Sequence, residues 1–136
     1  NHHIYSSFIA EEFIKGQLYH CDFIMKNDLY EFIEVSEYMR NGLSFINGFN
    51  HGSILFKKDS SLRSSIIEFC KNINTVLGLK SGSGHIEIFL NEKQELIFLE
   101  AAARPAGSAV PIMFTKTFNK NFLNAALLAD IDENVG

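Results

Sequence analysis

Short blocks of apolar residues, separated by polar turns, fill the first part of the chain. Three such blocks lie at residues 7–14, 18–25 and 29–38, and polar residues at 15–16 and 26–28 separate them. The blocks are rich in Ile, Phe and Tyr, and their spacing is typical of β-strands joined by turns. The pattern therefore predicts three successive strands that pair as a meander.

A helical period replaces the strand pattern in the middle of the chain. Residues 41–57 mix glycine, asparagine and aromatic residues and predict a long loop, which is often a functional segment. From Leu62 onward apolar residues recur every three or four positions, so a helix is expected up to Gly78, which suits a helix C-terminus. Residues 59–61 can cap its first turn. A second helix is expected over about 119–129, with one apolar face that holds Phe122, Leu123, Ala126 and Leu127.

Between the two helices the sequence predicts a β-hairpin. Residues 85–90 and 95–101 are apolar runs joined by the polar turn 91–94. Strands and helices together indicate an α+β fold, an antiparallel β-sheet with flanking helices. The chain of 136 residues is long enough for one core, so we expect a single domain over 1–136.

Composition excludes several classes of protein. The net charge of −4 argues against a surface for nucleic acid or anionic lipid, since both attract basic patches. No apolar run approaches the roughly 20 residues that span a bilayer. Cys21 and Cys70 lack the spacing of metal ligands and are expected to be buried, reduced thiols. We therefore expect a cytoplasmic protein without nucleic-acid or membrane partners.

The hairpin carries the most distinctive chemistry. His85, Glu87 and Phe89 alternate onto one face of their strand, and the opposite face is wholly apolar. If the hairpin turns about 91–94, Glu100 lies nearly opposite Glu87, and two like charges facing each other are destabilising. A divalent cation between them would reverse that effect, and magnesium favours such carboxylate ligands. The alternative is two solvated glutamates on an exposed sheet face.

Arg104 follows this hairpin at a position that favours anion binding. It comes after three alanines, which let a bulky ligand approach, and before the loop 105–108. A guanidinium group there can bind phosphate oxygens or stabilise developing negative charge. The alternative is that Arg104 forms an ion pair with one of the two glutamates.

These residues resemble a known signature. Residues 85–89 followed by 99–107 are similar to the C-terminal signature of the ATP-grasp superfamily, in particular its carboxylate–amine ligase branch, which includes bacterial L-amino acid ligases. Residues 11–16, with Asp22 on the next strand, resemble the hinge segment at which that family binds adenine. The similarity extends from about residue 8 to 128. It implies that the chain is a C-terminal ATP-grasp portion.

At the adenine end, the resemblance assigns three residues. Glu11 would accept a hydrogen bond from the adenine amino group, the backbone of Ile14 would meet the ring edge, and Phe89 would pack against the ring face. Leu18 stands where many relatives have a glutamate that binds the ribose. The ribose contact is therefore not expected to follow the usual pattern.

At the phosphate end, the resemblance implies a metal and an anion site. Glu87 and Glu100 would hold Mg²⁺, or Mn²⁺ in its place, on the ATP phosphates. Arg104 would stabilise an acyl-phosphate, and His85 would lie near the transferred phosphoryl group. Ala102 replaces an asparagine that many members use for a second magnesium, and amino acid ligases share this alanine.

The implied reaction uses ATP and magnesium to phosphorylate a small-molecule carboxylate, after which an amine displaces phosphate to give an amide bond. The family's N-terminal domain and its lysine-bearing central lid do not occur in these 136 residues. We therefore expect this chain alone to be inactive. The alternatives are a carboxylate–thiol ligase, a carboxylase-type ATP-grasp enzyme and a noncatalytic nucleotide-binding module. A homodimer is a further expectation for the intact enzyme.

Overall fold

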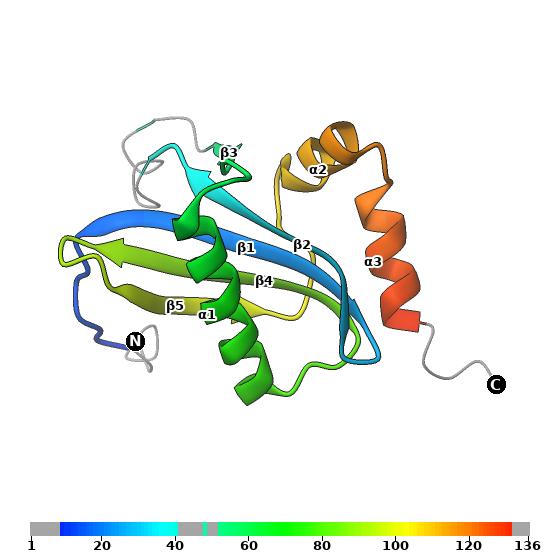
Figure 1. The fold of residues 1–136 in the computed structure, drawn as a ribbon, viewed down its shortest axis with the longest axis horizontal. Coiled ribbons are helices and arrows are strands. Elements are labelled where there is room, and N and C mark those ends of the chain that lie inside the picture. Colours follow the sequence, from blue (N-terminus) through cyan, green and yellow to red (C-terminus); the bar gives the residue numbers. More distant parts are fainter. Residues whose placement is uncertain (1–8, 41–47, 49–51, 132–136) are drawn as a thin grey trace, which may run out of the picture.

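The computed structural model describes residues 9–40, 48 and 52–131. Its centre is a five-stranded antiparallel sheet in the order β3-β2-β1-β4-β5 (Figure 1). The strands are β1 (Gly16–Lys26), β2 (Leu29–Tyr38), β3 (Ser53–Leu55), β4 (Gly82–Asn91) and β5 (Leu96–Ala102). This arrangement confirms the predicted α+β class. The second and third strands of the predicted meander pair with each other as β1 and β2, and the predicted hairpin pairs as β4 and β5.

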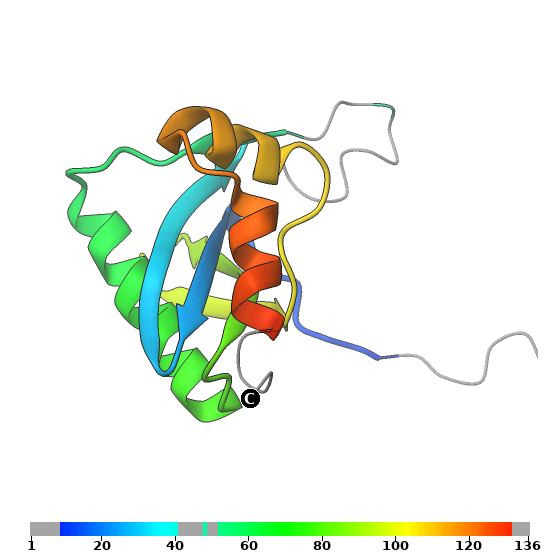
Figure 2. The same ribbon diagram turned by 90° about the vertical axis from the view of Figure 1, so that its right-hand side faces the viewer.

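Helices cover the sheet from both sides and make three layers (Figure 2). Helix α1 (Ser61–Leu77) packs on one face, and helices α2 (Val110–Phe118) and α3 (Phe122–Ile131) pack on the other. Gly78 ends α1 with φ 78°, a left-handed conformation that glycine adopts without strain. Ser60 occupies the N-cap position but makes no side-chain capping bond. None of the helices in the described residues is long and apolar enough to cross a membrane.

The face toward α1 holds the main hydrophobic core. Alternate residues of β1 point into it because successive side chains of a strand lie on opposite faces. Ile86 and Ile88 of β4 are both fully buried there, which confirms the predicted apolar face of that strand. The buried core residues on this side are Tyr19, Cys21, Phe23, Met25, Val35, Ile66, Cys70, Ile86 and Ile88. Both cysteines are free, as expected.

The opposite face divides into an apolar half and a polar half. Phe32 packs edge-on against three phenylalanines of α2 and α3, and Ile24 lies in the same cluster. The polar half of this face includes His20 and Asp22 of β1 and their cross-strand partners Glu87 and His85 of β4. Helices α2 and α3 pack on the apolar half. The polar residues instead contact one another, and two of them, His85 and Glu87, line a cavity.

The predicted first strand is wrong where the structure describes it. Residues 9–15 belong to no strand, and Ile9 and Phe13 are exposed by 88% and 70%. Both edges of β1 are already paired, with β2 and with β4, so no edge remains beside it. Residues 7 and 8, and most of the loop 41–57, lie outside the described residues. The end of that loop contributes β3, a strand that the sequence pattern did not predict.

The C-terminal helices also differ from the expectation. Helix α2 was not predicted. Its Pro111 lies in the first turn, where the missing N–H costs nothing. Helix α3 begins at Phe122 and not at 119. Phe122 and Ala126 are buried as expected, but Leu123 and Leu127 are exposed by 53% and 56%. The predicted common face of these four residues is therefore wrong.

Candidate functional site

Glu87 and Glu100 are direct neighbours across β4 and β5, as the sequence predicts. Their pairing depends on a β-bulge. From Leu90 to Ile88 the strands pair one to one, and Glu87 then pairs with Glu100, so Leu99 is an extra residue of β5. Without it, alternation would turn Glu100 to the opposite face of the sheet. The bulge thus brings both carboxylates to the same face.

The two carboxylates line a cavity of about 280 Å³ between the sheet and the segment that leads into α2. His85 and Arg104 line the same cavity, so the structure brings all four predicted phosphate-end residues together. The guanidinium group of Arg104 is exposed and donates to the carbonyl of Pro105 at 2.9 Å. Among the residues that the structure describes, it pairs with no carboxylate, which disfavours the ion-pair alternative.

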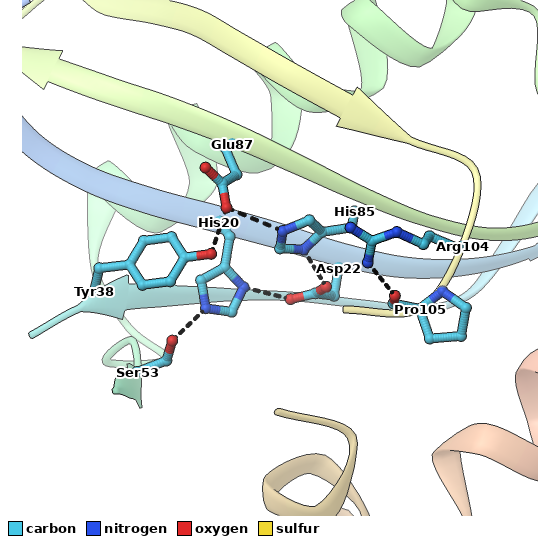
Figure 3. A network of polar contacts seen from close by, with 8 residues as sticks. All are labelled: His20, Asp22, Tyr38, Ser53, His85, Glu87, Arg104 and Pro105. Carbon is cyan, nitrogen blue, oxygen red and sulfur yellow. Dashed lines mark hydrogen bonds and ion pairs between the residues drawn. The ribbon is translucent and has the colours of Figure 1, made fainter. Parts of the chain in front are cut away.

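Beneath the cavity lies a chain of buried polar side chains centred on Asp22 (Figure 3). Oδ1 of Asp22 accepts from Nδ1 of His85 at 2.8 Å, and Oδ2 accepts from Nδ1 of His20 at 2.6 Å. The second nitrogen of His20 bonds to Oγ of Ser53 in β3 at 2.8 Å. His20 and Asp22 are fully buried, so each relies on these partners for its hydrogen bonds.

The same chain ends on the metal-ligand candidate Glu87. Nε2 of His85 donates to Oε1 of Glu87 at 3.2 Å, and the hydroxyl of Tyr38 donates to the same oxygen. Both hydrogen bonds that described residues make to this carboxylate therefore fall on Oε1. The other oxygen, Oε2, accepts no hydrogen bond from a described residue.

These contacts determine the charge of the site. Burial by itself lowers the pKa of His85, but its hydrogen bonds to Asp22 and Glu87, and their charges, outweigh burial and raise it to about 9. Burial pushes the pKa of Asp22 and of Glu87 upward, and the hydrogen bonds they accept hold both below the ordinary value. Burial and the hydrogen bond to Glu87 raise the pKa of Tyr38. At neutral pH the chain therefore holds an imidazolium between two carboxylates.

Two groups of side chains could hold a cation. Glu87 and Glu100 offer oxygen ligands on the cavity wall, which is the donor set that magnesium prefers. His20, Asp22 and His85 offer three ligand atoms within 4.8 Å of one another. However, each oxygen of Asp22 already accepts an imidazole N–H, so a metal there would have to replace both hydrogen bonds. The glutamate pair is the better metal site.

The predicted adenine-end residues lie farther along the sheet. Ile14 lines a second hollow, of about 280 Å³, beside the turn 91–94 and Ile97. Phe89 is the cross-strand partner of Ile97 on the face that carries Glu87, and on its other side it pairs with the buried Leu18. Glu11 is exposed and lines neither hollow. Ile14 and Ile97 thus line the same hollow, and Phe89 is the cross-strand partner of Ile97. Glu11 does not line this hollow.

Sequence reasoning missed three members of the polar chain, namely His20, Tyr38 and Ser53. The sequence pattern could have revealed His20, because His20 and Asp22 are two positions apart on a predicted strand and therefore share a face. Tyr38 and Ser53 come from β2 and β3, and their contact with β1 and β4 depends on the order of strands in the sheet. Nothing in the local sequence indicates it.

Comparison with known proteins shows what this chain is similar to. A family model for the ATP-grasp domain matches residues 1–112. The chain is 28% identical over 125 residues to an L-arginine-specific L-amino acid ligase of Bacillus subtilis, covering 90% of this chain and 29% of that protein. It is 30% identical over 135 residues to alanine–anticapsin ligase of Bacillus subtilis (strain 168), covering 91% of this chain and 28% of that ligase.

Solved structures share the fold. The L-amino acid ligase from Bacillus licheniformis superposes with a TM-score of 0.72 at 20% identity, over 91% of this chain and 31% of that chain. D-alanyl-alanine synthetase A from Vibrio cholerae superposes with a TM-score of 0.63 at 12% identity, over 90% and 40%. The chain thus spans less than a third of the curated relatives above. On the match of the domain model to most of its length, the chain belongs to the ATP-grasp family.

Proposed function

We propose that this chain supplies part of the ATP and metal site of a carboxylate–amine ligase. The observation that carries the proposal is the pairing of Glu87 with Glu100 across the bulge, in one cavity with Arg104. Similarity to two amino acid ligases supports an amine as the acceptor. Since the chain spans 29% of the first of these relatives, the proposed activity would belong to a longer enzyme to which this chain contributes one part.

The proposed adenine and phosphate contacts lie on one face of β4. Phe89 and Glu87 are two residues apart on one face, and two residues of a strand span about 7 Å. In our proposal the adenine ring packs near Phe89 and the hollow at Ile14, and the phosphates reach the glutamate pair. Glu11 would need to turn toward the ring to accept from its amino group, because it is exposed in the structure.

At the phosphate end each side chain has a separate task. Glu87 and Glu100 would hold Mg²⁺ or Mn²⁺, which when bound neutralises phosphate charge. Arg104 has donors free to turn from Pro105 toward phosphate oxygens or the negative charge of an acyl-phosphate. Both N–H groups of His85 already bond to carboxylates, so His85 contributes its positive charge and holds Glu87 in place. The substrate carboxylate itself is the nucleophile, and positioning with charge neutralisation supplies the catalysis.

The test is to replace each glutamate in the complete enzyme. We expect Glu87→Gln and Glu100→Gln each to lower Mg²⁺-dependent phosphate release at least about 100-fold, because several kcal/mol of transition-state charge stabilisation are lost. Glu68→Gln is the matched control, since Glu68 is exposed on α1, on the other side of the sheet. Phosphate release would be measured with amino acids as carboxylate and amine.

The acceptor decides between this proposal and its competitors. Release that requires a thiol or bicarbonate, and not an amine, would replace the amine ligase with a carboxylate–thiol ligase or a carboxylase-type enzyme. Tight Mg–ATP binding without phosphate release under any acceptor would indicate a noncatalytic module. Full activity in both glutamate variants would refute the metal assignment itself.

A further inference from the structure

His20 and Asp22 form a polar pair that does not reach the cavity. Both are fully buried, and neither lines the hollow that contains Glu87. A buried carboxylate is costly unless its oxygens are satisfied, and Asp22 is satisfied only because an imidazole binds each oxygen. The contacts of a ligand in the cavity therefore do not explain why this pair is present.

The donor and acceptor roles in the hydrogen bonds of this pair are fixed by chemistry. A carboxylate can only accept, so Nδ1 of both His20 and His85 must donate to Asp22. With Nδ1 of His85 held in this way, its ring presents Nε2 to Oε1 of Glu87. The orientation of Glu87 thus depends on Asp22 through one intervening ring, and the orientation of Asp22 depends on His20.

His20 also touches the second group that orients Glu87. Its ring lies 4.7 Å from the ring of Tyr38, centroid to centroid, and 5.3 Å from that of His85. Both neighbours bond to Oε1 of Glu87. The far nitrogen of His20 is held by Ser53 of β3, so four strands contribute to the support of one carboxylate.

We infer that His20 and Asp22 are positioning residues, which hold His85 and Tyr38 so that Glu87 keeps Oε1 engaged and turns Oε2 to the cation. This inference rests on the proposed role of Glu87 as a metal ligand. Hydrogen-bonded partners behind metal ligands typically change metal affinity or activity by about 10- to 100-fold when they are removed. An effect of that size on cation binding is what distinguishes positioning from mere packing.

The direct test measures the binding of Mn²⁺ to the complete enzyme. The electron paramagnetic resonance signal of the free ion reports how much Mn²⁺ is unbound. We expect His20→Leu and Asp22→Asn each to weaken Mn²⁺ binding about 10-fold or more. His20→Asn retains a donor at the position of Nδ1 and should stay within about threefold of the wild type. Cys21→Ala is the matched control, because Cys21 lies between the two on β1 but faces α1.

A double-mutant cycle separates the two explanations. If His20 acts through Glu87, adding His20→Leu to Glu87→Gln should weaken Mn²⁺ binding less than about threefold further. Losses that multiply in full would overturn the inference, as would a folded His20→Leu variant with wild-type Mn²⁺ affinity. The proposed function fails separately: weakened Mn²⁺ binding in the variants, in an enzyme that releases no phosphate with any acceptor, would support the inference and refute the ligase.

Discussion

Two identical residues have different environments in this site. Glu87 has one oxygen engaged by Tyr38 and His85 and a pKa held below the ordinary value, whereas Glu100 is exposed on the edge strand. A carboxylate that is already oriented binds a cation without losing further rotational freedom, and an exposed one can adjust to the phosphates. If the pair binds a cation as we propose, Glu87 would be the preorganised ligand and Glu100 the adaptable one.

His85 makes stability depend on pH in a defined direction. Its pKa rises from 6.5 to about 9 on folding, so the folded chain holds this proton more tightly than the unfolded chain. The corresponding stabilisation is complete below pH 6.5 and is lost as the pH rises through about 9. In the absence of metal we expect the free energy of unfolding in urea to fall by on the order of 2 kcal/mol over this interval.

The control for this prediction is the neutral variant His85→Gln. It should be less stable than the wild type at pH 6.5, because the two carboxylates lose a cationic partner. Its free energy of unfolding should change little between pH 6.5 and about 9. Equal pH dependence in variant and wild type would show that another group is responsible.

At the scale of elements, the strand β4 must fit closely between its neighbours. A β-carbon added to Gly84 would lie 2.1 Å from Cζ of Phe23, a core side chain exposed by only 2%. The Phe23 ring also packs edge-on against Tyr30, so it has little room to move. Glycine at this position therefore serves packing between β1 and β4.

The change Gly84→Ala should consequently destabilise the protein. Overpacking of a core typically costs about 1–3 kcal/mol, and we expect a loss of that size in the free energy of unfolding. Gly107→Ala is the control, since an added β-carbon there meets no atom within 4 Å. Thermal or urea unfolding of both variants would measure the difference, and equal stability of the two would contradict the packing role.

The bulge at Leu99 determines which face of the sheet carries Glu100. Simple alternation along β5 separates Ile97 from Glu100 by three positions and would put them on opposite faces. In the structure both lie on the face of Phe89 and Glu87, because the bulge adds one residue to β5. The hairpin predicted from its turn was correct, but the sequence pattern did not reveal how its register is achieved.

At the scale of the whole molecule, several apolar side chains of α2 and α3 are exposed. Ile112, Leu123, Leu127, Leu128 and Ile131 are all more than half exposed. Leu123, Leu127 and Ile131 recur every four residues, so they share one side of α3. Isolated apolar residues on a surface are ordinary, whereas a row of them on one helix is typical of a surface that contacts another polypeptide.

We expect the 136-residue chain alone to show no measurable ligase activity. The cavity of about 280 Å³ has Glu87, Glu100 and Arg104 on its wall, but in the described residues lysine is absent from its lining. Phosphate release from ATP and amino acids would be compared with that of the complete enzyme at equal concentration. Turnover by the chain alone at a comparable rate would contradict the proposal that this chain supplies only part of the site.

Local pattern by itself determined the class of the fold and most of its strands. Residues 18–38, 61–77 and 82–102 fold close to their predicted boundaries, since alternation and helical period are local properties. The same pattern indicated His85, Glu87 and Glu100 as candidates, because ionisable residues stand out in otherwise apolar strands. Arg104 was a candidate because of its place in the segment that follows β5. The exposed segment 9–15 was wrongly predicted as a strand, because it has the composition of a strand but pairs with no neighbouring strand in the described residues.

Only the tertiary structure decided what supports the site. The contacts of His20 with Ser53 and of Tyr38 with Glu87 join residues 33 and 49 positions apart, through the strand order β3-β2-β1-β4. No local period encodes such pairings, because they depend on which strands become neighbours and on single-residue bulges. The sequence thus predicted a set of candidate side chains, and the packing of the sheet decided which of them lie together and which neighbours hold them.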